Sequence, residues 1–253
     1  MATLVLGSGC TKGEKGTDVS PSDAHANHDQ HDQHGQHGQH DHGHHGHGHN
    51  DELNEHGYKG HTFDDPRAWI ERFESPERAA WQRPDEVVAG LALARDAKIA
   101  DLGAGTGYFS VRFAAAAPQG RVFAVDIEPK MVEWLSQRAA DEGHANLEGV
   151  LGEANDPKLP EAVDVAFMCN VFHHLAEPQA YFQSVATQLR PGARVVIVDF
   201  RKDAPEHAPG PPQSMRMSPE QITEHMQAAG FRLARKDLEL LEYQYLLEFV
   251  VTD

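Results

Sequence analysis

Residues 98–107 have the sequence KIADLGAGTG, in which a short apolar segment leads directly into three glycines placed at every second position. The segment Lys98–Leu102 has the length and apolar character of a buried strand. A helical spacing of apolar residues follows Gly107, so the glycines lie at a turn from strand to helix. At such a turn the bare backbone lets a ligand approach the amide groups at the start of the helix. The stretch therefore predicts a parallel α/β sheet with a ligand site after its first strand.

On both sides of this stretch the chain alternates between strands and helices, as in a parallel sheet covered on both faces. The expected strands are 98–102, 121–125, 147–151, 163–168, 193–200, 231–238 and 243–251. A helix carrying Phe182, Val185 and Leu189 is expected to stop at residues 190–192. The last two strands are too close together for a helical crossover, so they should pair as an antiparallel hairpin. The predicted fold is Rossmann-like and doubly wound, with a mostly parallel seven-stranded sheet.

The sequence divides into three regions of different composition, of which the last forms the expected fold. Residues 1–61 have almost no aliphatic side chains beyond the first few, so we expect a disordered segment. Residues 62–95 should form short helices, because a capping residue precedes a proline at Pro66 and at Pro76. These helices would cover either a pocket, as a lid, or a sheet edge, and the sequence leaves both open. Residues 96–253 form the expected folded domain.

The disordered segment is rich in histidine. Neutral imidazole is a good ligand for zinc, nickel and copper, so close spacing predicts weak, multivalent binding of a divalent transition metal. The alternative is a spacer whose histidines have no specific role, and no catalytic metal site is expected in either case. The candidate ligands are His25, His28, His31, His34, His37, His40, His42, His44, His45, His47 and His49.

Two acidic residues define the ligand expected at the glycine turn. Asp126 ends the second strand, at the spacing where an acidic side chain binds ribose hydroxyls in nucleotide-binding βαβ units. Asp101 directly precedes the glycines, where it would repel a pyrophosphate but accept hydrogen bonds from the ammonium group of a methionine moiety. The third glycine also follows the second by two positions instead of three, unlike a dinucleotide site. Both features favour S-adenosylmethionine over NAD.

The stretch Ile99 to Phe200 resembles the class I S-adenosylmethionine-dependent methyltransferases, especially their small-molecule branch of the type 11/25-like domains. The resemblance rests on five blocks in the family's order. They are DLGAGTG at 101–107, AVDIEP at 124–129, GEANDP at 152–157, NVFHHL at 170–175 and LRPG at 189–192.

The resemblance implies roles for individual residues. Asp126 would hold both ribose hydroxyls, and Glu153 with the Ala154 backbone would recognise adenine. Asn170 would lie beside the methionine and the departing methyl group. The family commonly has Asp or Asn where Glu153 stands, and Asp156 competes for the adenine contact. The full expected cofactor set is Asp101, Gly103, Ala104, Gly105, Gly107, Asp126, Ile127, Glu153, Ala154 and Asn170.

Two histidines follow the fourth strand at the expected mouth of the site. An imidazole of His173 or His174 would deprotonate a hydroxyl or position an acceptor, and the sequence does not choose between the two. The alternative is that one packs against the next helix and the other is solvated. Cys169 should pack as a small apolar residue. Arsenic methylation, which related enzymes perform through several thiols, is not expected because the sequence has only two cysteines.

Charge and hydropathy limit the partners. The chain has 39 acidic and 22 basic residues, a formal net charge of −17, so we expect a small-molecule acceptor and no nucleic acid. No apolar run is long enough for a transmembrane helix. The start of the chain as given predicts a cytoplasmic protein, whereas LVLGSGC at 4–10 resembles a short lipoprotein signal that would lipidate Cys10. The sequence indicates no oligomeric state.

Three functions thus follow from the sequence. The first is methyl transfer from S-adenosylmethionine to a small molecule. The second is metal handling by the histidine-rich segment, with an inactive methyltransferase fold behind it. The third is NAD-dependent oxidation or reduction, which Asp101 and the glycine spacing disfavour.

Overall fold

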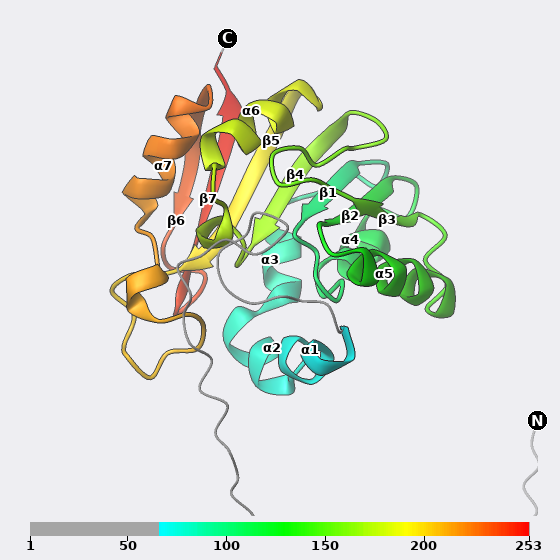
Figure 1. Cartoon of the computed structure of the whole chain (residues 1–253), viewed down its shortest axis with the longest axis horizontal. Helices are drawn as coiled ribbons and strands as arrows, with labels where there is room; N and C mark the ends of the chain where they lie inside the picture. Colours follow the sequence, from blue (N-terminus) through cyan, green and yellow to red (C-terminus); the bar gives the residue numbers. More distant parts are fainter. Residues whose placement is uncertain (1–65, 253) are drawn as a thin grey trace, which may run out of the picture. The chain divides into compact units, whose positions relative to one another are not determined.

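A computed structural model describes residues 66–252, and these residues contain a seven-stranded sheet in the order β3-β2-β1-β4-β5-β7-β6 (Figure 1). The first five strands pair in parallel, whereas β7 is antiparallel to both β5 and β6. The predicted Rossmann-like fold with a C-terminal antiparallel pair is therefore confirmed. The strands are β1 Lys98–Leu102, β2 Arg121–Asp126, β3 Leu147–Leu151, β4 Val163–Cys169, β5 Leu189–Phe200, β6 Phe231–Asp237 and β7 Gln244–Val251.

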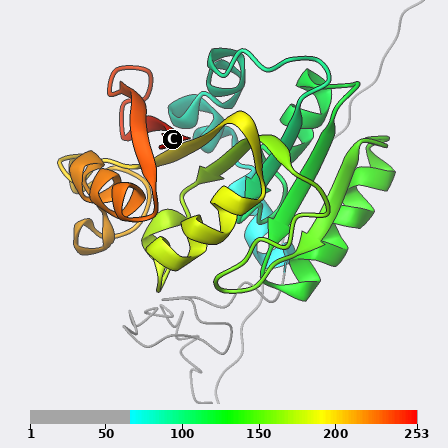
Figure 2. The ribbon, with the colours of Figure 1, turned by 90° about the horizontal axis from the view of Figure 1, so that it is seen from above.

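Helices cover both faces of this sheet (Figure 2). Six of the seven α-helices in residues 66–252 begin at a proline, whose fixed φ suits the first turn and whose missing N–H is not needed there. Ser75 caps one of them and Ser218 forms the expected capping box with Gln221. The helices are α1 Pro66–Phe73, α2 Pro76–Gln82, α3 Pro84–Gly90, α4 Ser110–Ala116, α5 Pro129–Asp141, α6 Pro178–Thr187 and α7 Pro219–Ala228, with 3₁₀ turns η1 Phe172–His174 and η2 Gln213–Met215.

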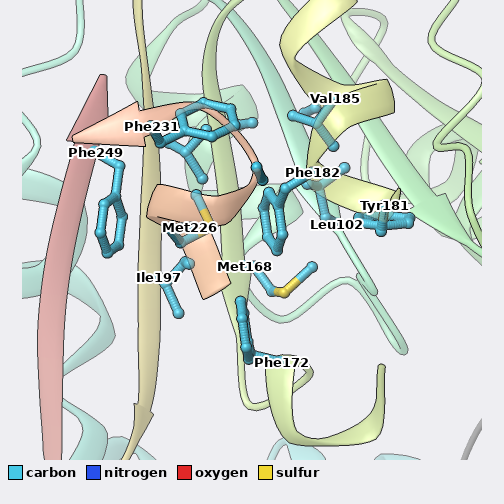
Figure 3. Close-up of a cluster of buried hydrophobic side chains, with 14 of the residues drawn as sticks. Leu102, Met168, Phe172, Tyr181, Phe182, Val185, Ile197, Met226, Phe231 and Phe249 are labelled. Carbon is cyan, nitrogen blue, oxygen red and sulfur yellow. The ribbon is translucent and has the colours of Figure 1, made fainter. Parts of the chain in front are cut away.

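The central strands are apolar on both faces, as a sheet buried between two helical layers requires. In β4, Ala166 and Met168 contact one hydrophobic cluster, while Val165 and Phe167 contact the other. The first cluster packs α6 and α7 against the sheet, and Phe182 lies at its centre (Figure 3). The ring of Phe182 is fully buried, with its centroid 5.5 Å from that of Phe172 and 6.3 Å from that of Phe231. This packing holds the start of the segment after β4 in place.

One local expectation is wrong. Leu189 does not belong to the helix before residues 190–192, because α6 ends at Thr187 and Leu189 begins β5. Leu189 pairs with Val163, and the register then shifts so that Arg194 pairs with Val165. The apolar spacing of the helix continues to Leu189 in the sequence. Strand pairing in the folded protein nevertheless places this residue in β5.

Several expectations concern residues outside the described range. The histidine-rich segment 1–61, the candidate lipidation site Cys10 and residues 62–65 are among them, so their predicted properties stay predictions. The same holds for the domain boundaries. Within residues 66–252, no helix combines the length and the apolar character that crossing a membrane requires.

Replacing Phe182 by alanine should lower the free energy of unfolding by about 3–5 kcal/mol, because the cavity would lie between two helices and the sheet. Denaturant titration followed by far-UV circular dichroism measures the change. Leu238→Ala is the control, since that side chain is 38% exposed and should change stability by less than about 1 kcal/mol. Equal losses in the two variants would contradict the assignment of Phe182 to the core.

Candidate functional site

The glycine turn has a backbone that other residues would strain. Gly103, Gly105 and Gly107 have φ values of 73°, 55° and 90°, all in the left-handed region. A Cβ on Gly103 would lie 2.5 Å from Val171 Cγ2, so this glycine is needed for packing as well. A Cβ on Gly105 would meet nothing closer than the ring of Phe73, at 3.7 Å. Gly105 is therefore where the backbone has most room for a ligand.

The backbone amides of this turn are already used within the protein. The N–H groups of Gly103 and Ala104 both donate to Val125 O, at 2.9 Å each. Gly107 N–H donates to Ala104 O at 3.0 Å, and Gly105 N–H donates to Asp126 Oδ2 at 2.9 Å. The turn is thus tied to the end of β2, with its amides directed inward.

Asp101 is a buried acid at the end of β1. Its side chain is 3% exposed and its Oδ2 accepts a hydrogen bond from Ser110 Oγ at 2.6 Å. Burial raises the pKa of Asp101 from 3.8 to about 7; the nearby Asp126 adds to the rise, while Ser110 and Arg78 oppose it. A cationic ligand beside Asp101 would favour its ionised form.

Asp126 is held by two backbone amides. Oδ2 accepts from Gly105 N–H, and Oδ1 accepts from Glu128 N–H at 3.0 Å. Burial raises the pKa of this carboxyl, and the two amide hydrogen bonds counteract the rise. Each oxygen keeps a second lone pair, so the carboxylate can accept from two vicinal hydroxyls. Ile127, the next residue, is partly buried.

The expected adenine contact is less well formed. The Glu153 side chain is 69% exposed and its Oε1 lies 3.3 Å from Lys158 Nζ. Its backbone forms a tight turn with Asp156 through two reciprocal amide hydrogen bonds of 2.8 and 3.2 Å. Asp156 Oδ1 also accepts from Lys158 N–H at 2.9 Å and from Gln188 Nε2 at 2.8 Å. Because Asp156 is engaged in this way and Ala154 is only partly buried, the adenine roles of Glu153 and Ala154 stay predictions.

A chain of side-chain amides joins the end of β4 to the N-terminal helices. Gln82 Nε2, on α2, donates to Gln244 Oε1 at 2.9 Å and to Cys169 Sγ at 3.0 Å. Gln244 Nε2 in turn donates to Asn170 Oδ1. Both glutamines are fully buried, and Asn170 has a φ of 62°, a conformation that asparagine tolerates. Sequence reasoning missed both glutamines because nothing in their local sequence distinguishes them.

Cys169 is the free thiol at this point of the structure. It packs against apolar neighbours, as expected, but also accepts the hydrogen bond from Gln82. Burial raises the pKa of the thiol, with Arg78 opposing the rise, so it stays protonated at neutral pH. A protonated thiol is a poor nucleophile.

His173 pairs with an acidic residue that sequence reasoning also missed. His173 Nδ1 lies 3.0 and 3.1 Å from the two carboxylate oxygens of Asp199 on β5. The two side chains are 3% and 1% exposed. An acceptor at Nδ1 fixes the neutral tautomer that leaves Nε2 free to accept a proton. The ring of His174 lies beside it, with the centroids 4.2 Å apart.

The N-terminal helices contact the glycine turn directly. Glu74, just after α1, forms an ion pair with Arg138 on α5 and accepts from Thr106 Oγ1 at 2.8 Å. Arg138 Nη1 also donates to Thr106 O at 2.8 Å, so each of these three residues contacts the other two. The Trp81 and Phe200 ring centroids are 5.6 Å apart. Helices α1 and α2 therefore lie over the carboxyl ends of β1 and β2, the strands that carry Asp101 and Asp126 (Figure 1).

Comparison with known proteins shows which family this chain is similar to. A family model described as a methyltransferase domain matches residues 93–248. A tRNA U34 carboxymethyltransferase of Desulfotalea psychrophila is 31% identical over 120 residues, which is 46% of this chain and 36% of that protein. An arsenite methyltransferase of Halobacterium salinarum is 33% identical over 139 residues, which is 53% of this chain and 34% of that protein. The chain thus matches only about a third of the length of either relative.

A solved structure extends the comparison to the fold. The S-adenosylmethionine-dependent methyltransferase of Aquifex aeolicus is 25% identical, with a TM-score of 0.67 over 74% of this chain and 99% of that chain. The family model covers the glycine turn, Asp101 and Asp126, and the structural match covers most of the described fold. The chain therefore belongs to the methyltransferase domain family and has the class I fold of the S-adenosylmethionine-dependent methyltransferases.

Proposed function

We propose that the protein transfers a methyl group from S-adenosylmethionine to a small-molecule acceptor. The observation that carries this proposal is the use of the loop amides. Four N–H groups of the glycine turn already donate to Val125 O, Ala104 O and Asp126, so they are not available to a pyrophosphate. A sulfonium nucleoside has no phosphate that would need these amides, and its positive charge is complementary to the buried Asp101 and the partly buried Asp126. The same observation disfavours NAD.

The side chains present fit this cofactor. Asp126 offers two fixed carboxylate oxygens for ribose hydroxyls, and Gly105 leaves room beside them. Asp101 is suited to an ammonium group, since a cation would offset the cost of ionising a buried carboxyl. When bound, S-adenosylmethionine supplies an electrophilic methyl group on a sulfonium centre.

His173 would serve as the base for a hydroxyl acceptor. Its Nε2 would take the proton of the hydroxyl as the oxygen bonds the methyl group, while Asp199 stabilises the imidazolium that forms. The bond from carbon to sulfur breaks in the same step, and its electrons remain on sulfur as a neutral thioether. Burial of His173 and Asp199 keeps water from competing for the hydrogen bond.

Charge supports a small acceptor over a nucleic acid. The name of the Desulfotalea relative says that it acts on tRNA, but this chain has 39 acidic and 22 basic residues. Such a balance weakens binding to a polyanion. The name of the Halobacterium relative says that it acts on arsenite. In this chain burial raises the pKa of the Cys169 thiol, so the thiol stays protonated and gives no support to thiol-based chemistry.

The metal-handling alternative has no support from the described residues. Within 66–252, no group of three or more His, Cys, Asp or Glu side chains is arranged to hold a metal ion. The histidines of the N-terminal segment lie outside this range, so metal binding by them stays a prediction.

Asp126→Ala should weaken binding of S-adenosylhomocysteine by about thirtyfold or more, because two hydrogen bonds to a charged acceptor are lost. Isothermal titration calorimetry measures the affinity, and a circular dichroism melt checks folding. Asp141→Ala, at the exposed end of α5, is the matched control and should bind as the wild type does. Unchanged binding by Asp126→Ala would refute the ribose assignment.

The raised pKa of Asp101 predicts pH-dependent cofactor binding. Because the ionised carboxylate binds the ammonium group, affinity for S-adenosylhomocysteine should increase as the pH rises toward about 7, by up to tenfold per unit, and then level off. The stability of the ligand-free protein should follow the opposite trend and decrease as the pH rises from 3.8 to about 7, because the buried carboxyl of the folded protein resists ionisation. Asp101→Asn should flatten the binding profile and stabilise the ligand-free protein at pH 8 by about 2–4 kcal/mol.

Titration calorimetry between pH 5.5 and 8 and thermal melts at the same pH values measure both effects. A binding profile with the same slope in Asp101→Asn and the wild type would show that another group titrates. Ser110→Ala is a useful comparison, because it removes one hydrogen bond to the carboxylate and should move the midpoint of the profile to higher pH.

His173→Gln should lower kcat for a hydroxyl acceptor by about 10²–10⁴-fold and change KM little, because the base acts only during the chemical step. The acceptor would come from a metabolite screen with methyl-labelled S-adenosylmethionine. Asp199→Asn should also lower kcat, but by less, because the base is retained while the carboxylate that orients it and stabilises the imidazolium is lost, whereas His174→Gln should retain most activity. Full activity of His173→Gln on a hydroxyl acceptor would contradict the role as base.

A further inference from the structure

The chain of side-chain amides at the end of β4 begins at an arginine. Arg78 Nε donates to Gln82 Oε1 at 2.6 Å, and Arg78 Nη1 donates to Phe73 O at 2.7 Å, so the guanidinium is held at two points. A guanidinium has N–H donors and no acceptor. Arg78 therefore fixes the amide oxygen of Gln82 toward itself and the Nε2 group of Gln82 away from itself.

The orientation of Gln82 determines that of the next amide. Gln82 Nε2 uses its two hydrogens on Gln244 Oε1, at 2.9 Å, and on Cys169 Sγ, at 3.0 Å. Because its oxygen is engaged in this way, Gln244 directs its own Nε2 group to Asn170 Oδ1. Both glutamines are fully buried, so a reversed amide would bring two donors or two acceptors together away from water. Each amide of the chain therefore has one favoured orientation.

Asn170 is the last member of this chain. Its Oδ1 accepts from Gln244, whereas its Nδ2 group has no hydrogen-bond partner among residues 66–252. Asn170 is partly buried, and its φ of 62° is a costly backbone conformation of the kind that clusters at functional sites. The side chain thus offers N–H donors, and not its oxygen, to a ligand at the end of β4.

The segment that carries Asn170 runs between the glycine turn and the candidate base. The next residue, Val171, packs against Gly103, where an added Cβ would lie 2.5 Å from Val171 Cγ2. His173 follows in the same short segment and is paired with Asp199. A donor at Asn170 and an acceptor at His173 Nε2 are therefore presented together at the end of β4.

We propose that Asn170 Nδ2 selects a methyl acceptor that carries a carbonyl oxygen besides its hydroxyl, and that Gln82 and Gln244 are the positioning residues for this selection. The inference rests on the proposed methyl transfer to a hydroxyl. A carbonyl oxygen accepts the N–H groups of Asn170. A group that offers only N–H donors at that point would face the donors of Asn170 and bind poorly.

The charge of the site favours an uncharged carbonyl over a carboxylate. Asp101, Asp126 and Asp199 all lie at or next to the carboxyl ends of their strands. Parallel strands bring these ends to one edge of the sheet, so an anionic acceptor would be repelled there. The acceptor class is therefore a neutral hydroxylated ketone, ester or amide.

Reversing the chain of amides tests the proposal at a residue that does not touch the acceptor. In Gln82→Glu both side-chain oxygens are acceptors, one for Arg78 and the other for the protonated thiol of Cys169 and for Gln244 Nε2. The amide of Gln244 must then turn over and place Oε1 toward Asn170. Asn170 turns over in response and presents Oδ1 to the acceptor, so the variant should prefer N–H donors to carbonyl oxygens.

The probes are the meta and para isomers of hydroxyacetophenone and of aminophenol. Both compounds have a phenol hydroxyl and are uncharged at neutral pH, but one adds a carbonyl oxygen and the other an N–H group. Each is titrated into ¹⁵N-labelled protein loaded with S-adenosylhomocysteine, and NMR follows the side-chain amide signal of Asn170, which is assigned by its loss in Asn170→Asp. The wild type should bind a hydroxyacetophenone about tenfold more tightly than the matching aminophenol, and Gln82→Glu should reverse the preference by a similar factor.

Gln227→Glu is the matched control, because it makes the same change of charge at an exposed position of α7. Its ratio of the two affinities should stay within about twofold of the wild type. Equal weakening of both probes by Gln82→Glu would show that the glutamine only supports the helices, and an unchanged ratio would likewise overturn the proposal. A wild-type Asn170 signal that moves with neither probe, or only with an aminophenol, would also overturn it.

If Gln82→Glu does not fold, Gln82→Met takes its place. Methionine removes the fixed direction without reversing it, so the two affinities should become equal within about twofold, and a retained preference would overturn the proposal. Calorimetry on the wild type separates the two proposals of methyl transfer and acceptor class. Absence of S-adenosylhomocysteine binding refutes the proposed function, whereas its binding without a preference for the carbonyl probes overturns this inference alone.

Discussion

The hydrogen bonds between the glycine turn and the end of β2 determine the geometry of the whole site. Val125 O accepts two amides of the turn, and Asp126 accepts a third through its side chain. These hydrogen bonds join the first two strands at the carboxyl edge, where parallel strands bring their ends together. Because they use the loop amides, they leave the carboxylates as the main polar groups for a ligand. A phosphate-free, positively charged nucleoside is the ligand that this arrangement accommodates best.

Polar groups are concentrated at that edge, whereas the helical layers on either face contribute apolar side chains. Asp101, Gln82, Gln244 and Asp199 are all buried there, and each would be costly in an apolar core. The glutamines and Asp199 have hydrogen-bond partners within the protein. Asp101 has a hydrogen bond but also a strongly raised pKa, so part of its cost remains in the ligand-free state. Such a distribution is typical of a functional site, where polar groups held ready for a ligand lower the stability of the ligand-free protein.

The N-terminal helices belong to the site as well as to the fold. Phe73 lies next to Gly105 and Gln82 donates to Cys169, so these helices reach both the glycine turn and the end of β4. Sequence patterns left open whether these helices cover a pocket or a sheet edge. The hydrogen bonds of Glu74 and Gln82 place them over the glycine turn and the end of β4. An acceptor bound near His173 would thus lie close to the chain of amides that joins α2 to Asn170.

The amino-acid sequence by itself determined the strand pattern, the glycine spacing and the two acids Asp101 and Asp126, because these signals are local and periodic. It misassigned Leu189, where the pairing with Val163 outweighed the helical spacing. Only the tertiary structure decided the partners Asp199, Gln244 and Arg78. Such partners lie far apart in the chain, 26 residues for His173 with Asp199 and 162 for Gln82 with Gln244, so no local pattern joins them. Folding brings them to one edge because parallel strands all end there, and only then do their charges and hydrogen bonds define a site.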